Sequence, residues 1–208
     1  MPEPAPPSPP ASPVTASTVC VFAGSARAVP EPHRALATRL GTHLACAGAT
    51  VVYGGGSTGL MGTMADAALA AGGTVIGVIP RGLFAREEVH HGVELVEVES
   101  LHDRKLIMLE LADAFAVLPG GFGTLDEVGE VLTWAQLGIH AKPTVFVDPD
   151  GYWSGLLAWV DAAVARGYVA AASQAFYTVV ADADGVLPAI TGFAPPPAVR
   201  GPLSREQT

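Results

Sequence analysis

Short apolar runs alternate with longer segments of helical spacing along most of this chain. The runs are rich in Val, Ile, Phe and Ala, and they predict strands at 19–24, 49–55, 73–80, 93–98, 113–121, 143–148 and 176–180. Between them, apolar residues recur every three or four positions, which predicts helices at 32–47, 59–71, 101–111, 123–137, 152–166 and 183–190. Apolar strands that alternate with helices indicate a parallel sheet covered on both faces. The pattern therefore predicts an open, doubly wound α/β fold of the Rossmann-like kind.

The two ends of the chain lack this pattern. Residues 1–18 and 193–208 are rich in proline and small residues, so we expect two flexible tails around one α/β domain at 19–192. The first tail has neither the basic start nor the apolar centre of a secretion signal. No apolar run reaches the roughly 18–20 residues that a membrane span requires. We therefore expect a cytoplasmic protein that does not bind membranes.

Charge and cysteine content narrow the possible partners. The formal net charge of −9 argues against nucleic acid, because duplex binding relies on a basic surface. The same charge repels an anionic small molecule, so any phosphate site has to be built locally from backbone N–H groups and a few cations. Cys20 and Cys46 lie in apolar segments without CxxC spacing. We expect both to pack in the core of a protein from a reducing compartment.

Glycine-bearing turns follow three of the predicted strands, at Gly24-Ser25, at 54–59 (GGGSTG) and at 119–124 (PGGFGT). In an open parallel sheet, ligands bind beyond the carboxyl ends of the strands, at a switch in strand order. We therefore expect the three turns to converge on one crevice. The turn at 54–59 matches neither GxGxxG nor the GxxxxGK[ST] loop, which argues against a nicotinamide enzyme or an ATPase. For each glycine there, a tight turn with positive φ is as good an explanation as contact with a ligand.

The turn at 119–124 carries the most chemical information. Its glycines allow the backbone to approach a ligand, and Thr124 is expected to open a helix whose free N–H groups and positive dipole end face an anion. Glu127 lies three residues further, on nearly the same helical face, where a carboxylate can act on a sugar attached to that anion. The alternative is a glycine turn followed by a Thr-x-x-Glu capping box, without any ligand.

Two further groups of residues are candidates for binding a ligand or a metal ion. Arg104 and Lys105 form a vicinal basic pair in a chain with only one other lysine, Lys142. Arginine can donate two hydrogen bonds to a phosphate or carboxylate, although a solvated pair on a helix surface explains the segment equally well. His90 and His91 have no third ligand at a recognised spacing, so we expect a surface turn there and no metal site.

With these motifs laid out, the chain resembles the LOG family, the cytokinin riboside 5′-monophosphate phosphoribohydrolases, long described as possible lysine decarboxylases. The family signature P-G-G-x-G-T-x-x-E stands here at 119–127. VCVFAGS and YGGGSTGLMG are similar to the first strand and second glycine turn of the family, and LHDRKLIM and TWAQLGIHAKP to two later segments. The resemblance covers about 19–177. Leu101, Ala23 and Asp126 depart from the usual family residues, which bears on base preference more than on activity.

The resemblance implies hydrolysis of the N-glycosidic bond of an adenine-type nucleoside 5′-monophosphate, without a cofactor, in a homodimer. It implies Arg104 and Glu127 as the catalytic pair. Thr133 lies about 120° around the helix from Glu127, so it is expected to serve the other subunit. Glu88 is the alternative to Glu87, because the match shifts by one residue there. The expected substrate contacts are Ser25, Gly55, Glu87, Lys105, Gly120, Gly121, Phe122, Gly123, Thr124, Leu125, Asp126 and Thr133.

Three other functions stay open at this point. A lysine decarboxylase would need pyridoxal phosphate on Lys105 or Lys142, and neither segment offers an obvious pocket for it. A non-catalytic carrier of a nucleotide or of molybdenum cofactor would use a similar fold and a similar glycine-rich loop. A nucleosidase with broad specificity for nucleoside 5′-monophosphates would need the same residues as the cytokinin enzyme.

Overall fold

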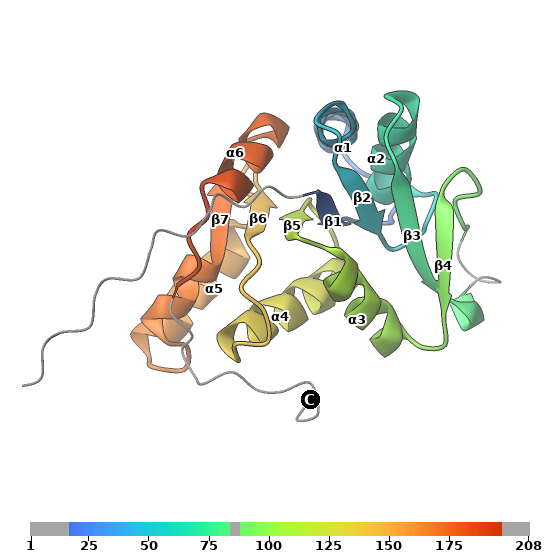
Figure 1. The fold of residues 1–208 in the computed structure, drawn as a ribbon. Helices are drawn as coiled ribbons and strands as arrows, with labels where there is room; N and C mark the ends of the chain where they lie inside the picture. Colours follow the sequence, from blue (N-terminus) through green and yellow to red (C-terminus); the bar gives the residue numbers. More distant parts are fainter. Residues whose placement is uncertain (1–16, 84–87, 197–208) are drawn as a thin grey trace, which may run out of the picture.

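In the computed structural model, which describes residues 17–83 and 88–196, seven parallel strands form one sheet (Figure 1). The strand order is β4-β3-β2-β1-β5-β6-β7, and every neighbouring pair is parallel. The strands are β1 (Thr18–Phe22), β2 (Thr50–Tyr53), β3 (Val75–Pro80), β4 (Glu94–Val98), β5 (Ala114–Val117), β6 (Thr144–Val147) and β7 (Tyr177–Val180). The predicted α/β fold is confirmed.

Helices cover both faces of this sheet (Figure 1). One face packs against α1 (Glu31–Cys46), α2 (Gly59–Ala70) and α6 (Val186–Thr191), and the other against α3 (Leu101–Leu111), α4 (Phe122–Gln136) and α5 (Ser154–Ala165). Short 3₁₀ turns lie at Arg81–Leu83, Ala171–Phe176 and Ala183–Gly185. Among the described residues, no helix is both long and apolar enough to cross a bilayer.

Burial on both faces explains why the strands are continuously apolar. In β1, Val19 and Val21 pack into the core on the α1 side, whereas Cys20 and Phe22 pack into the core on the α3 side. Burial raises the pKa of the Cys20 thiol well above its ordinary value, so this cysteine is a packing group as predicted. The same prediction is wrong for Cys46, which is exposed because it ends α1 on the solvent side of that helix.

The strand order places a topological switch between β1 and β5. The chain runs outward from β1 through β2 and β3 to β4, and then returns to the other side of β1 with β5. Phe22 and Val117, the last residues of the two strands, are paired. The turns that follow therefore start side by side, and the Gly24 N–H donates to the Pro119 carbonyl at 3.0 Å. Such a switch is where open α/β sheets bind ligands.

The remaining glycine turn joins the same edge of the sheet. The Leu60 N–H donates to the Gly24 carbonyl at 2.8 Å, and the Thr58 hydroxyl donates to the Ser25 carbonyl at 2.9 Å. Gly59 has φ +63°, and a Cβ there would overlap the backbone of Ser25, so only glycine fits. Hydrogen bonds thus join the three turns at one edge of the sheet, as expected, although residues 54–59 do not line the cavity at that edge.

Two local predictions differ from the structure. The helix after β5 begins at Phe122, with Gly121 as its N-cap and no capping side chain, so the capping-box alternative at Thr124 is wrong. The prediction of a surface turn at His90 is wrong, because this side chain is buried. Its Nε2 lies 3.0 Å from Asp66 Oδ1, and its Nδ1 accepts the Gly92 N–H at 3.1 Å. These partners satisfy both ring nitrogens, and only His91 is exposed.

Close packing of α1 on α2 generates a testable prediction about stability. A Cβ on Gly41 would overlap the carbonyl oxygen of Met64, so Gly41→Ala has to push the two helices apart. We expect the free energy of unfolding to fall by about 1–3 kcal/mol, measured by urea denaturation. The matched control is Gly155→Ala in α5, where a Cβ meets open space. That change is expected to be neutral or to stabilise by up to about 1 kcal/mol, and an equal loss in both variants would contradict the packing argument.

Candidate active site

A cavity of about 670 Å³ opens at the switch between β1 and β5. Its walls come from the turn after β1, the first turns of α1 and α2, α3, the PGGFGT loop with α4, and the segment after β6. Of the residues predicted from sequence, the cavity brings together Ser25, Arg104, Glu127 and residues 120–124. Segments that lie far apart along the chain therefore meet in one hollow.

The first turn of α4 gives this cavity an anion-binding wall. The N–H groups of Phe122, Gly123 and Thr124 begin the helix, so no earlier turn supplies carbonyls to accept them. The positive end of the helix dipole adds to their attraction for an anion. Thr124 lies on the cavity with its side chain buried, one turn before Glu127.

Packing within the protein requires some of the glycines in this loop but not others. A Cβ on Gly120 would overlap the Thr124 side chain, so packing alone requires glycine there. At Gly121 and Gly123, a Cβ would meet no protein atom within 4 Å, and neither residue has positive φ. Both border the cavity. Their missing side chains leave open the space in front of the amides, which is where an anion would bind.

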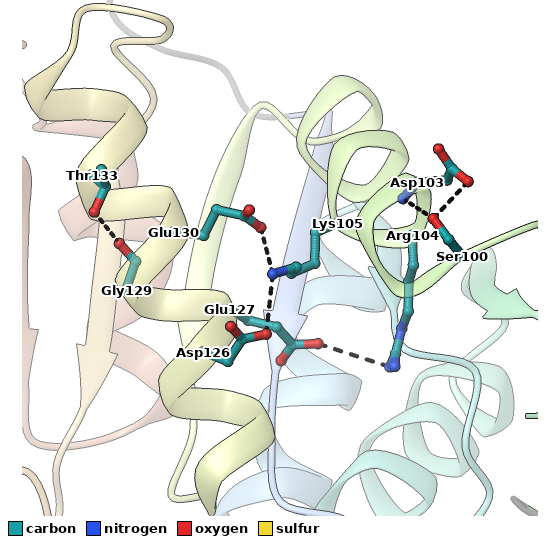
Figure 2. A network of polar contacts seen from close by, with 9 residues as sticks. All are labelled: Ser100, Asp103, Arg104, Lys105, Asp126, Glu127, Gly129, Glu130 and Thr133. Atoms are coloured by element: carbon teal, nitrogen blue, oxygen red, sulfur yellow. Dashed lines mark hydrogen bonds and ion pairs between the residues drawn. The ribbon is translucent and has the colours of Figure 1, made fainter. Parts of the chain in front are cut away.

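Arg104 reaches the cavity from α3. Ser100 caps this helix by accepting the Asp103 N–H at 3.1 Å, and Arg104 lies on its buried face one turn before Met108 (Figure 2). Arg104 Nη2 donates to the Gly54 carbonyl at 3.1 Å. A Cβ on residue 54 would overlap that nitrogen, so the glycine turn after β2 is shaped around the guanidinium.

Glu127 faces Arg104 across the gap between α4 and α3 (Figure 2). Glu127 Oε1 and Arg104 Nη2 are 3.8 Å apart, and the two side chains are only 13% and 10% exposed. At this depth water screens the two opposite charges poorly, so they attract each other more strongly than an exposed pair would. The separation exceeds a direct hydrogen bond. A buried cation and a largely buried carboxylate thus share the cavity with the anion-binding loop.

Lys105 points away from the cavity, although it adjoins Arg104 in sequence. Its Nζ lies 3.1 Å from Asp126 Oδ2 and 3.0 Å from Glu130 Oε2, and so ties α3 to α4 (Figure 2). Burial acts to lower the pKa of Lys105, but hydrogen bonds and charges from Glu130 and Asp126 outweigh it and raise that pKa. Lys142 donates to the Leu109 carbonyl at 2.6 Å and also lies off the cavity. Both amino groups are engaged in these contacts and neither lysine lines the cavity, which disfavours a Schiff base there.

Four other predicted contact residues lie outside the cavity lining. Gly55 has φ +77°, and its carbonyl accepts the His90 N–H at 3.0 Å, so the tight-turn explanation suffices. Asp126 is paired with Lys105. Leu125 and Thr133 line a separate apolar groove of about 460 Å³ between α4 and α5. For these four, substrate contact within one subunit stays a prediction without geometric support.

The glutamate predicted at 87 lies outside the described residues. Its alternative, Glu88, forms an exposed ion pair with Arg27 at the turn after β1. The Glu88 carbonyl also accepts the backbone N–H of Ser57 at 2.7 Å and its hydroxyl at 2.8 Å. Glu88 therefore fastens its own segment onto the glycine turn after β2.

Sequence reasoning missed three residues on the cavity wall, namely His33, Asp150 and Tyr152. His33 Nε2 lies 3.0 Å from Asp150 Oδ2, and the Tyr152 hydroxyl donates to the Gly120 carbonyl at 2.5 Å. For two of them, their position in the chain could have indicated the site. Asp150 and Tyr152 follow β6, which neighbours β5, and so they lie at the same carboxyl edge as the three glycine turns.

Comparisons with known proteins place this chain in a family. The family described as "Possible lysine decarboxylase" matches residues 61–190. A probable cytokinin riboside 5′-monophosphate phosphoribohydrolase of Oryza sativa subsp. japonica is 46% identical over 178 residues, which is 85% of this chain and 78% of the relative. The cytokinin riboside 5′-monophosphate phosphoribohydrolase of Rhodococcoides fascians is 43% identical over 178 residues, which is 85% of this chain and 90% of the relative.

Solved structures show the same fold at lower sequence similarity. The molybdenum cofactor carrier protein of Chlamydomonas reinhardtii superposes with a TM-score of 0.63 over 83% of this chain and 94% of its own, at 24% identity. That likeness concerns the fold alone. The sequence matches are far stronger and span the glycine-rich loop, Arg104 and Glu127. The chain therefore belongs to the LOG family, the cytokinin riboside 5′-monophosphate phosphoribohydrolases, whose members also carry the description of possible lysine decarboxylases.

Proposed function

We propose that this protein hydrolyses the N-glycosidic bond of an adenine-type (cytokinin) nucleoside 5′-monophosphate, releasing the free base and ribose 5-phosphate. One observation carries the proposal: the first amides of α4 and the buried Arg104–Glu127 pair border the same cavity. The loop suits the phosphate, and the pair lies about one helical turn away, where the ribose and its bond to the base would be. The family relatives carry this activity in their names.

The phosphate half of the site has to overcome the acidic character of the whole chain. With a net charge of −9, the protein attracts an anion only through local groups. The amides of residues 121–124 supply such groups, and Ser25 borders the same space from the turn after β1. Binding energy from the phosphate, which does not react, can then orient the ribose for the chemical step.

In the part of the site where the bond is cleaved, the reaction separates charge. Cleavage builds positive charge on the ribose and negative charge on the departing base. Glu127 would stabilise the oxocarbenium-like sugar, orient its hydroxyls or help to activate water, and Arg104 would donate to the base as it leaves. Because the two groups are buried and fixed before substrate arrives, little reorganisation is needed in the transition state.

We further propose a homodimer formed through the face of α4 and α5. Trp159 is 64% exposed and Leu125 is 41% exposed, and both border the apolar groove between these helices. An exposed apolar surface of this kind is typical of a protein interface. Thr133 lies in the same groove, on the side of α4 away from the cavity. It would therefore meet substrate only from a second subunit.

The first test changes each member of the proposed catalytic pair in turn. Glu127→Gln and Arg104→Lys are each expected to lower kcat by on the order of a hundredfold or more, since each removes charge or geometry needed in the transition state. Release of free base from AMP and from isopentenyladenosine monophosphate is followed by chromatography. The ratio of the two rates for the wild type gives the base preference, and binding of monophosphates without any hydrolysis would support a carrier.

Glu94→Gln serves as the matched control, because Glu94 is an exposed carboxylate at the start of the edge strand β4. It is expected to keep wild-type rates. Circular dichroism establishes whether each variant is folded. A folded Glu127→Gln variant with an undiminished kcat would refute the role assigned to this carboxylate.

The second test uses the glycines that packing does not require. Gly121→Ala and Gly123→Ala each put a methyl group into the space facing the loop amides, where no protein atom lies within 4 Å. We expect KM for the monophosphate to rise on the order of tenfold (~1.4 kcal/mol) while the melting temperature stays unchanged. Gly155→Ala, with equally open surroundings, is the control. Unchanged KM in both loop variants would show that the anion binds elsewhere.

The third test concerns the dimer. Trp159→Glu puts a charge into the apolar groove, so we expect the dimer dissociation constant to rise at least about tenfold. Sedimentation velocity over a range of concentrations measures it. Tyr168→Glu is the control, because Tyr168 is exposed but lies off the groove. A wild-type protein that sediments as a monomer, or a Trp159→Glu variant that stays dimeric, would contradict this interface.

A further inference from the structure

Three consecutive carbonyl groups in the glycine-rich loop are each held by a hydrogen bond. The Pro119 carbonyl accepts the Gly24 N–H at 3.0 Å, and the Gly121 carbonyl accepts the Leu125 N–H at 3.0 Å. Between them, the Gly120 carbonyl accepts the Tyr152 hydroxyl at 2.5 Å. Two of these donors are backbone amides. Among the described residues, Tyr152 is the one side chain with a hydrogen bond to these carbonyls.

Holding a carbonyl also fixes the amide that follows it. The peptide group is planar and trans, so its C=O and the N–H of the next residue point in opposite directions. The bond from Tyr152 to the Gly120 carbonyl therefore orients the N–H of Gly121, a residue of the cavity wall. This peptide lies between two glycines and can rotate more freely than any other in the loop. It is the peptide that most needs a tether.

Tyr152 itself is held in place although it is 47% exposed. Its ring lies edge-on to Trp153, with centroids 5.0 Å apart, and edge-on to His33, at 5.8 Å. Trp153 is buried and packs edge-on against Phe146 in the core. His33 is buried and bonded to Asp150. These contacts restrict the ring, so the hydroxyl is presented to the loop in a fixed direction.

We propose that Tyr152 is a positioning residue for the phosphate, acting through the Gly120–Gly121 peptide. Its hydroxyl keeps the Gly121 amide aimed into the cavity before substrate arrives, which lowers the cost of ordering the loop on binding. The inference rests on the proposed function, because it assigns a ligand to that amide. It gives Tyr152 no role in bond cleavage, since Arg104 and Glu127 perform that step. Tyr152 therefore determines affinity for the 5′-phosphate.

Tyr152→Phe tests this role, because it removes the hydroxyl and keeps the ring. We measure KM and kcat for AMP hydrolysis, and the dissociation constant of ribose 5-phosphate by calorimetry. Loss of one such hydrogen bond is expected to raise both KM and the dissociation constant roughly fivefold, with kcat within about twofold of wild type. Tyr168→Phe is the matched control, since it removes a hydroxyl from an 83% exposed tyrosine outside the cavity.

The outcomes separate this inference from the proposed function. If wild type binds ribose 5-phosphate and Tyr152→Phe binds it equally well, the positioning role is wrong and the proposed function stands. A drop in kcat with an unchanged dissociation constant also overturns the role, because it would place Tyr152 in the chemical step. A lower melting temperature with unchanged affinity would show a structural residue only. If wild type binds neither ribose 5-phosphate nor AMP, the proposed function itself fails.

Discussion

The parallel pairing of β1 with β5 is the constraint on which the site depends. The two strands come from distant parts of the sequence and end together at Phe22 and Val117. Beyond that point the chains turn away on glycines, and the Gly24 N–H joins the Pro119 carbonyl. A Cβ on Gly24 would lie 3.1 Å from the Gly120 Cα, a contact so tight that the two turns would have to move slightly apart. The first turn of α4 faces the cavity because this hydrogen bond fixes the loop that leads into the helix.

Most of the fold could be predicted from the sequence because local and long-range signals agree. Strands buried on both faces have to be apolar throughout, and the turns between them carry glycine. The errors arose where a partner lies elsewhere in space. His90 was assigned to the surface because its partner Asp66 belongs to α2. Cys46 was assigned to the core because its immediate neighbours in the sequence are apolar. The predicted start of α4 was wrong because the helix begins at Phe122 without a capping side chain, so no sequence signal marks its first residue.

The sequence predicts the motifs of the site well, but it predicts poorly which way their side chains point. The family resemblance places both Arg104 and Lys105 at the substrate, but successive residues on a helix point about 100° apart. One of them therefore faces the cavity and the other faces α4, and the sequence does not indicate which. For Tyr152 the sequence offers only its place after β6, because its partner is a backbone carbonyl in a loop that precedes it by 32 residues. Contacts of side chains with distant backbone have no sequence signature.

The fit of Arg104 against Gly54 has an evolutionary consequence. A side chain at position 54 would occupy the volume of the guanidinium, so such a substitution has to displace Arg104 from the Gly54 carbonyl. Once a larger residue has settled there, restoring the arginine alone no longer restores the ion pair with Glu127. The two positions are thus epistatic, and loss of the pair is hard to reverse. Descendants that took this route would keep the fold and the glycine-rich loop as binding proteins.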